Sequence, residues 1–238
     1  MLWALFHGSP YPASMKAQIT DFHGADGAFG GPLAAEGREI LDALATTPLY
    51  LKASDQAGKS GSLIFSPVAT NKAIGDALTP RGWTKWDVPN NLAMFGIDVD
   101  YAKHGVVVEC QFSNYPFLMN NVVRSDLFHR RAIMIGAQGC AALVVITKAR
   151  MFPASNSTLY YEQAVAQLRE AEREGMFRVP VRLIGLFEDI GVSVPAKIIG
   201  YASKRYSRTA TGTKDIRCRL VPNREDGGRC HIEVEEQD

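Results

Sequence analysis

Hydrophobic and polar positions alternate along two neighbouring stretches near the middle of the chain. Residues 97–100 read Ile-Asp-Val-Asp, with an acid at every second position. Residues 106–112 read Val-Val-Val-Glu-Cys-Gln-Phe, a β-branched run that turns polar at alternate positions. Both patterns are typical of β-strands with one buried face. The segment 101–105 between them holds a glycine and two charged or titratable residues, and it is predicted to be the turn of a hairpin.

This hairpin would place an acidic pair and an amide close together. Asp100 and Glu109 approach each other across the two strands, and Gln111 shares a face with Glu109, because side chains alternate along a strand. Two carboxylates and an amide that converge are the surroundings that a hard, oxygen-seeking cation such as Mg²⁺ needs. The same pattern also fits an exposed hairpin whose acids are merely solvated, and the alternation alone does not separate the two interpretations.

Periodicity along the rest of the chain predicts alternating helices and buried strands. Helical spacing and composition predict helices over residues 33–47, 71–78, 117–131 and 159–174. Continuous apolar runs predict strands buried on both faces over residues 140–147 and 179–187. Ser157 and Thr158 are the candidate caps of the last helix, whereas the glycine-rich residues 24–31 are expected to form a loop. The resulting order predicts an α/β fold with a mixed central β-sheet flanked by helices.

The length of the chain bounds its domain organisation. At 238 residues it suffices for one large domain with a substantial core. We predict a disordered extension over residues 1–14 and a single domain over residues 15–238, within which residues about 188–238 form a smaller β-rich elaboration. The hydrophobic fraction of 46% and the charged fraction of 21% are ordinary for a globular protein and argue against disorder or a coiled coil.

Charge and cysteine usage add further constraints. The net charge is only +1, but seven bases and one acid leave six positive charges in residues 197–219, interleaved with Tyr201 and Tyr206. Such a run fits an anionic partner or a solvated face. The four cysteines lack metal-ligand spacing, which favours a reducing cytoplasm. No apolar run approaches the roughly 20 residues of a membrane span, so no membrane partner is expected.

Several motifs that follow one another in order resemble a known nuclease family. An Asp followed on the next strand by Glu-x-Gln, and then by a helix, resembles the core of the PD-(D/E)xK nucleases. Six segments are similar to BglII and its close relatives among the type II restriction endonucleases: Lys52-Ala-Ser-Asp-Gln-Ala, Gly61-Ser-Leu-Ile-Phe, Glu109-Cys-Gln-Phe-Ser-Asn-Tyr-Pro-Phe-Leu, Met151-Phe-Pro-Ala-Ser-Asn-Ser, Leu159-Tyr-Tyr-Glu-Gln-Ala and Lys204-Arg-Tyr-Ser-Arg-Thr. The similarity runs with gaps from about Ile19 to Thr211 and implies a restriction-endonuclease-like core.

The resemblance also implies an activity and a metal. It implies a homodimer that cuts a palindrome in double-stranded DNA and leaves 5′ overhangs, with Mg²⁺ held by Asp100, Glu109 and the backbone carbonyl of Cys110. Asp100, Glu109 and Gln111 match the catalytic positions of the family. Gln111 stands where most of these nucleases place a lysine, and an amide supplies no positive charge, so its expected role is to orient the attacking water.

DNA recognition is implied by further matching positions. They are Ser113, Asn114, Asn156, Ser157, Tyr206, Arg208, Lys204 and Arg124. Because these positions match, the resemblance favours a GATC-centred site, AGATCT, in which the outer base pair is the less constrained. Each position also has a plainer interpretation: Asn114 and Asn156 suit a turn or a helix cap, and Arg208 suits a phosphate contact.

Three classes of function remain open at this stage. The first is a Mg²⁺-dependent, sequence-specific endonuclease. The second is a DNA-binding relative that no longer cuts, or a structure-selective repair nuclease that prefers nicks, mismatches or junctions to an intact palindrome. The third is a small-molecule metal hydrolase, which would show no salt-dependent affinity for DNA, whereas phosphate contacts make DNA binding fall steeply with salt.

Overall fold

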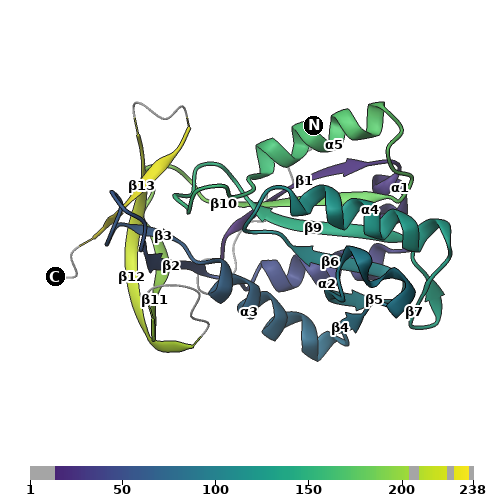
Figure 1. Ribbon diagram of the computed structural model, residues 1–238. Coiled ribbons are helices and arrows are strands. Elements are labelled where there is room, and N and C mark those ends of the chain that lie inside the picture. Colours follow the sequence, from purple (N-terminus) through teal and green to yellow (C-terminus); the bar gives the residue numbers. More distant parts are fainter. Residues whose placement is uncertain (1–13, 204–208, 224–227, 236–238) are drawn as a thin grey trace.

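The computed structural model describes residues 14–203, 209–223 and 228–235 of the chain. A central mixed sheet forms the larger part of the molecule (Figure 1). In order across the sheet, its strands are β1 (Lys16–Phe22), β10 (Val181–Phe187), β9 (Ala142–Lys148), β6 (Val106–Cys110), β5 (Asp98–Lys103) and β4 (Thr84–Asp87). Strands β10, β9 and β6 run parallel to one another, and β1, β5 and β4 pair antiparallel with their neighbours.

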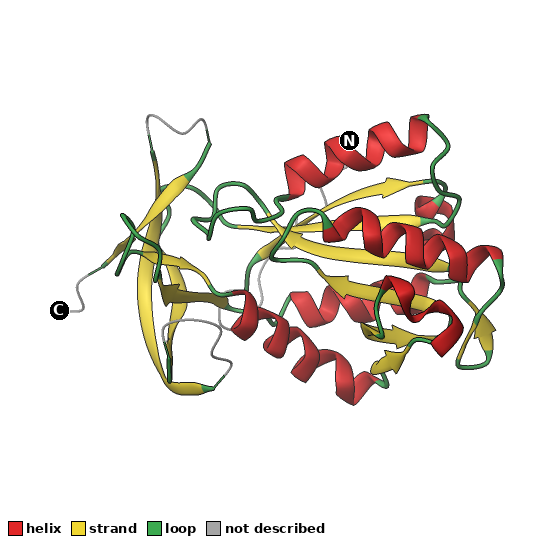
Figure 2. Cartoon of the chain, in the orientation of Figure 1, coloured by secondary structure: helices red, strands yellow, loops and turns green. Residues whose placement is uncertain are grey.

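Helices cover both faces of this sheet, as Figure 2 shows. One face packs against α4 (Phe117–Arg130) and α5 (Tyr161–Arg173). The other face packs against α1 (Ala25–Gly30), α2 (Ala34–Leu44) and α3 (Pro67–Leu78). Every residue of β9 is buried, as its unbroken apolar run predicts for a strand covered on both faces. The predicted mixed α/β fold is thus confirmed.

A second sheet stands at one end of the molecule, to the left in Figure 1. Its strands are, in order, β13 (Cys230–Val234), β12 (Ala210–Pro222), β11 (Val194–Tyr201), β2 (Leu49–Ala53) and β3 (Leu63–Phe65). The predicted C-terminal elaboration is therefore incomplete, because β2 and β3 join it from residues 49–65. Leu51, Phe65 and Ile216 of this sheet belong to the same core cluster as Val106 of the central sheet. One core therefore runs through both sheets.

Shorter elements connect the main ones. Two 3₁₀ helices, η1 (Thr79–Arg81) and η2 (Asn90–Phe95), flank β4, and a small ribbon of β7 (Met134–Ile135) and β8 (Gln138–Gly139) follows α4. None of the helices in the described part of the chain is long and apolar enough to span a membrane. The four cysteines all lie in described residues and carry free thiols.

Two local predictions were wrong. Residues 24–31 were expected to form a loop, but six of them form α1, because Ala25 and Phe29 gain buried contacts that outweigh the low helix propensity of glycine. The candidate caps of α5 do not cap it: Tyr160 precedes the helix, and no side-chain hydrogen bond caps that end. The Thr158 hydroxyl instead donates to the Phe112 carbonyl at 2.8 Å, within the segments that follow β6 and β9.

Candidate active site

The β5–β6 hairpin holds the predicted acidic pair. Tyr101 pairs with Val108 in an antiparallel register, which places Asp100 opposite Glu109. Strand β5 extends to Lys103, further than the sequence predicts, whereas β6 ends already at Cys110. The turn therefore shrinks to His104 and Gly105, with φ angles of 44° and 79°. Two-residue hairpin turns whose twist matches that of the strands require a positive φ at both central residues. A short, rigid turn therefore fixes the register that brings the carboxylates together.

Strand β5 contains a β-bulge at Asp100 and Tyr101. On the β4 side, Thr84 pairs with Ala102 and Trp86 with Val99, so that Asp100 and Tyr101 together face the single residue Lys85. Side chains along a regular strand alternate between the two faces of the sheet, so residues three apart lie on opposite faces. The bulge shifts this alternation, and Val99 and Ala102 therefore pack into the same core cluster. Bulges occur next to active sites, where they re-aim a side chain.

The bulge leaves Asp100 partly buried and directed at the end of β6. Its Oδ2 accepts a hydrogen bond from the backbone N–H of Cys110 at 2.8 Å. Burial raises the pKa of Asp100, this hydrogen bond lowers it, and the nearby Asp98 raises it further. The net effect is an increase in the pKa of Asp100, and burial is its largest cause.

Glu109 is buried and paired with Arg124 of α4. The Arg124 Nη2 donates to Glu109 Oε1, and its Nη1 donates to the backbone carbonyls of Asp98 at 2.8 Å and Phe95 at 3.3 Å. Burial raises the pKa of Glu109 to about 8; Arg124 opposes this rise and Asp100 adds to it. Gly96 makes room for the guanidinium, because a Cβ there would lie 2.5 Å from Nη1.

The position of Arg124 offers another role beside the predicted one. Arg124 was expected to contact DNA, which stays a prediction, and it is 4% exposed with its guanidinium bonded to Glu109 and two backbone carbonyls. Its five N–H groups make it suited to hold a carboxylate and two carbonyls at once. In the described structure Arg124 is therefore a support of Glu109.

Gln111 lies on the same face as Glu109, as the alternation predicts. Its Nε2 donates to the Asn114 carbonyl at 3.0 Å, and its Oε1 accepts from Asn121 Nδ2 at 3.5 Å. Asn121 Oδ1 in turn accepts from Arg124 Nη2 at 3.4 Å. A chain of polar contacts thus connects Gln111, through Asn121 and Arg124, to Glu109.

The two oxygen ligands fit a divalent cation. Asp100 and Glu109 face each other across the hairpin and the Cys110 backbone lies beside them, so the donor set is made of oxygen atoms. Among the described residues, no group of three or more His, Cys, Asp or Glu side chains could hold a metal ion. Mg²⁺ does not require one, because it retains several waters and often takes one or two carboxylates together with substrate phosphates. Burial raises the pKa of both carboxyl groups, and the charge of Asp100 adds to the rise of the pKa of Glu109.

The predicted base-reading residues come together from two distant segments. Ser113 and Asn114 follow β6, and Asn156 and Ser157 lie in the loop before α5. The Leu159 N–H donates to the Ser113 carbonyl at 3.0 Å, and the Tyr115 N–H donates to the Ser157 carbonyl at 3.3 Å. We call residues 112–114 and 156–159 the paired reading segments. Lys204, Tyr206 and Arg208 lie outside the described residues.

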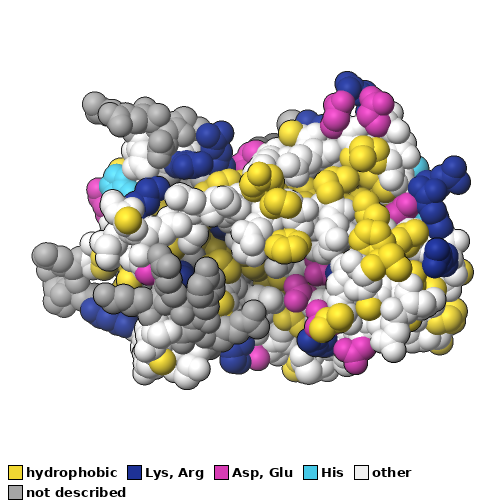
Figure 3. Space-filling view, in the orientation of Figure 1, with side chains coloured by type: hydrophobic (Ala, Val, Ile, Leu, Met, Phe, Trp, Pro, Cys, Tyr) yellow, Lys and Arg dark blue, Asp and Glu magenta, His cyan; other side chains and the backbone are white. Residues whose placement is uncertain are grey.

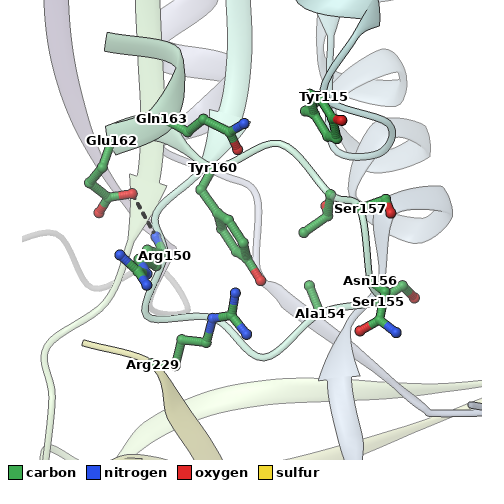
Figure 4. Close-up of a pocket in the computed structure, with 11 residues that line it drawn as sticks. Tyr115, Arg150, Ala154, Ser155, Asn156, Ser157, Tyr160, Glu162, Gln163 and Arg229 are labelled. Atoms are coloured by element: carbon green, nitrogen blue, oxygen red, sulfur yellow. Dashed lines mark hydrogen bonds between the residues drawn. The ribbon is translucent and has the colours of Figure 1, made fainter. Parts of the chain in front are cut away.

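Hollows border the paired reading segments. Ser113, Asn114 and Asn156 line one of about 120 Å³. A larger hollow of about 550 Å³ lies beside it, and its lining includes Asn156, Ser157, Tyr160 and Arg229 (Figure 4). The guanidinium of Arg229 lies over the Tyr160 ring, 5.7 Å from its centroid. The smaller hollow is lined by Phe112, Ser113 and Asn114, the segment that continues directly from Gln111.

Two lysines near the site were not predicted. Lys85 pairs with Asp98 beside the bulge, and the charge of Asp100 also contributes to raising its pKa. Its place depends on the bulge, for which the sequence offers only a weak sign in the apolar spacing of Val99 and Ala102. Lys148 is completely buried behind the paired reading segments. The sequence signal that could have indicated its burial is its place at the end of an apolar run, Val-Val-Ile-Thr-Lys.

Known proteins with similar sequences and structures were compared with this chain. The family model described as restriction endonuclease BglII/BglIII matches residues 17–186. The type II restriction enzyme BglII of Bacillus subtilis is 46% identical over 208 residues, which cover 87% of this chain and 92% of that protein. The crystal structure of restriction endonuclease BglII complexed with a DNA 16-mer matches with a TM-score of 0.87 and 44% identity, covering 93% of this chain and all of that one. The crystal structure of free BglII matches with a TM-score of 0.71 and 37% identity over the same shares. The conformation described here is thus more similar to the DNA-bound relative.

Proposed function

Because this chain belongs to the BglII/BglIII restriction endonuclease family, we propose that it is a Mg²⁺-dependent enzyme that cuts double-stranded DNA at AGATCT and leaves 5′ overhangs. The observation that carries the proposal is the continuity of one segment. Glu109 and Gln111 at the end of β6 lead within three residues to Ser113 and Asn114, which line the hollow beside Asn156. A group that cuts phosphodiesters and a group that reads bases therefore occupy neighbouring positions on one rigid strand end.

The residues of the hairpin have distinct roles in this proposal. Asp100, Glu109 and the Cys110 carbonyl would hold Mg²⁺, and the chemistry that the ion would supply is stabilisation of negative charge on a phosphate and a lower pKa of a bound water. Arg124 fixes the carboxylate of Glu109 through its charge and its anchored guanidinium. Gln111 orients the attacking water with an amide whose position is set by Asn114 and Asn121.

Metal affinity is expected to rise with pH up to about 8. Burial, with Arg124 opposing and Asp100 adding, raises the pKa of Glu109 to about 8 in the metal-free protein. Below that pH a cation must displace a proton, because a ligating carboxyl group has to be ionised. Calorimetric titration with Mg²⁺ in two buffers of different ionisation enthalpy should therefore report about one proton released near pH 6.5 and almost none near pH 9. The Glu109→Gln variant should release none, and equal release by the wild type at both pH values would contradict the prediction.

Base reading is proposed for the exposed polar residues of the paired reading segments. Asn156 is exposed at the rim of both hollows, and an asparagine can pair bidentately with adenine in the major groove. Asn156→Ala should reduce discrimination between AGATCT and a site with one changed base pair by roughly 1–3 kcal/mol. The ratio of kcat/KM values for the two duplexes measures it. Asn90→Ala, at an exposed asparagine that begins η2, is the matched control and should leave the ratio unchanged.

The proposed assembly is a homodimer that uses α4. Phe117 is 51% exposed and Val123 is 37% exposed on this helix. Hydrophobic side chains gather over the region of α4 and α5 in the space-filling view (Figure 3). A palindromic site is matched by a protein with two-fold symmetry. Sedimentation equilibrium would give the mass of the assembly and so test whether it is a dimer.

We also propose a cytoplasmic location, which the four free thiols fit.

A digest of a sequenced plasmid tests the proposal most directly. Purified protein with Mg²⁺ should yield discrete fragments whose ends map to AGATCT sites and carry 5′ overhangs. Fragments at other sequences would refute the proposed site, and no cleavage of an intact palindrome would refute the proposed activity. Preference for nicked or mismatched duplexes would instead support a repair nuclease.

A further inference from the structure

Lys148 is a completely buried cation in a polar cluster that the proposed mechanism does not use. It is the last residue of β9, and its relative exposure is 0%. Its ammonium donates to the Phe112 carbonyl at 2.7 Å, to Thr158 Oγ1 at 2.6 Å and to the Leu159 carbonyl at 3.1 Å. None of these three acceptors is a carboxylate. The three N–H donors of the ammonium therefore meet three neutral oxygen atoms.

The three acceptors belong to the paired reading segments. Phe112 lies between Gln111 and Ser113, and Thr158 and Leu159 directly follow Asn156 and Ser157. Lys148 is thus bonded to both segments at once, from behind. The preceding residue, Thr147, adds a bond from its buried hydroxyl to the Gln111 carbonyl at 2.8 Å. The end of β9 consequently connects the catalytic strand to both segments.

A contribution to the stability of the fold does not by itself explain why a lysine is buried at this position. Burying a charge without an opposite charge is costly, and apolar residues of similar volume at such positions are often neutral or stabilising. Among the residues that the structure describes, the groups that face the ammonium are the three oxygen atoms above and the rings of Phe65 and Tyr160, whose centroids lie 5.6 Å and 5.1 Å away. Burial lowers the pKa of Lys148 to about 7.

We propose that Lys148 is a positioning residue for sequence discrimination, because its ammonium fixes the two base-reading segments relative to each other and to Gln111. Lys148 touches no DNA in this proposal. It acts by holding Ser113, Asn114, Asn156 and Ser157 in one arrangement, in which the correct bases are paired and incorrect ones are not. The inference rests on the proposed function and deepens it, since it names the group that sets fidelity.

The test compares Lys148→Met with Lys103→Met. Methionine fills the space of the lysine and removes its three hydrogen bonds. Lys103 offers a matched control, because its ammonium also bonds to oxygen atoms, those of Glu39 and the Arg81 carbonyl, but at the turn end of β5. The readout is the ratio of kcat/KM for the AGATCT duplex to kcat/KM for duplexes with one changed base pair. We expect this ratio to fall about tenfold or more in Lys148→Met and to stay unchanged in Lys103→Met.

A second variant keeps the inference testable if Lys148→Met does not fold. Thr158→Val removes one acceptor with little change of shape, and it should lower the ratio in the same direction by a smaller factor. In the double variant the two effects should be less than additive, because both changes break the same contact. An unchanged ratio in a folded Lys148→Met or Thr158→Val protein, shown by thermal melting, would overturn the inference.

The pH dependence of the discrimination ratio is a second measurement, and a lysine with a purely structural role would not give this ratio a pH dependence. Below about pH 7 the ammonium has three donors for three acceptors, and the neutral amine above that pH has two. Discrimination by the wild type should therefore decrease between about pH 6 and pH 9, and Lys148→Met should show no such decrease. Ionisations shared by both duplexes cancel in the ratio. Equal slopes in the two proteins would contradict the inference.

The design separates this inference from the proposed function. Wild-type cleavage of the AGATCT duplex reports on the proposed function alone. If the wild type cuts another sequence, the panel of changed duplexes is built around that sequence. If it binds without cutting, the ratio of dissociation constants in Ca²⁺ replaces the kinetic ratio, and Lys148→Met should still lower it.

Discussion

Asp100→Asn is expected to lower the rate of DNA cleavage by roughly three orders of magnitude or more, because a metal ion contributes several kcal/mol to charge stabilisation and each 1.36 kcal/mol is tenfold in rate. The substitution keeps the shape of the side chain, and its oxygen can still accept from the Cys110 N–H. It removes the negative charge that faces Glu109 across the hairpin. Single-turnover cleavage of a duplex in saturating Mg²⁺ measures the loss, whereas specific binding in Ca²⁺ should remain largely intact.

Asp98→Asn provides a matched control for this result. Asp98 lies on the same strand two residues earlier, and its carboxylate pairs with the exposed Lys85. Surface ion pairs contribute about 0–1 kcal/mol, so a small loss of activity is expected there. Comparable losses in the two variants would mean that the assignment of the metal ligand to Asp100 is wrong.

In the metal-free protein at about pH 9, where Glu109 of the wild type is ionised, Arg124→Met is expected to destabilise the fold by roughly 3–5 kcal/mol, because it leaves a buried carboxylate without its partner. It also frees the carbonyls of Phe95 and Asp98 from their bonds to the guanidinium. The pKa of Glu109, already raised to about 8 by burial, should rise further once the opposing charge is gone. Cleavage near neutral pH should fall as well, since less of the carboxyl group is ionised.

Urea denaturation of the metal-free protein measures this effect. Arg173→Met on α5 is the control, because Arg173 pairs with Glu170 at the exposed surface and should contribute less than about 1 kcal/mol. Glu109→Gln combined with Arg124→Met should recover much of the lost stability, since the buried charge is then absent. An Arg124→Met protein as stable as the wild type, but weakened in DNA binding, would support the DNA contact that the sequence suggested.

The pH dependence of stability in the metal-free protein follows from the same carboxyl group. The pKa of Glu109 is raised in the folded state, so between about pH 4.5 and pH 8 the folded protein binds more protons than the unfolded chain. Stability contributed by this group therefore decreases as pH rises through that window. Bound Mg²⁺ offsets the decrease, because it replaces the proton as the partner of the ionised carboxylate.

The sequence was sufficient wherever a feature depends on residues close together in the chain. The alternation in residues 97–100 and 106–112 predicted the hairpin, and with it the approach of Asp100 to Glu109. Helical periodicity placed α4 and α5 to within two residues at each end. The motifs around residues 109–118 and 151–157 led to the family that the comparisons confirm.

Tertiary structure alone decided the features that join distant segments. The bulge at Asp100 requires β4 as a partner, the burial of Arg124 requires α4 to pack over β6, and the joining of β2 to β11 links residues far apart in the chain. Lys148 would be an ordinary polar end of a strand without the two segments that surround its ammonium. A repeat of two or 3.6 residues records which face of an element is buried, but it does not record which other element covers that face. That covering element supplies the polar partners of a buried charge. The pattern along the chain therefore established where the carboxylates lie. Only the packing established which residues hold the carboxylates and which hold the paired reading segments beside them.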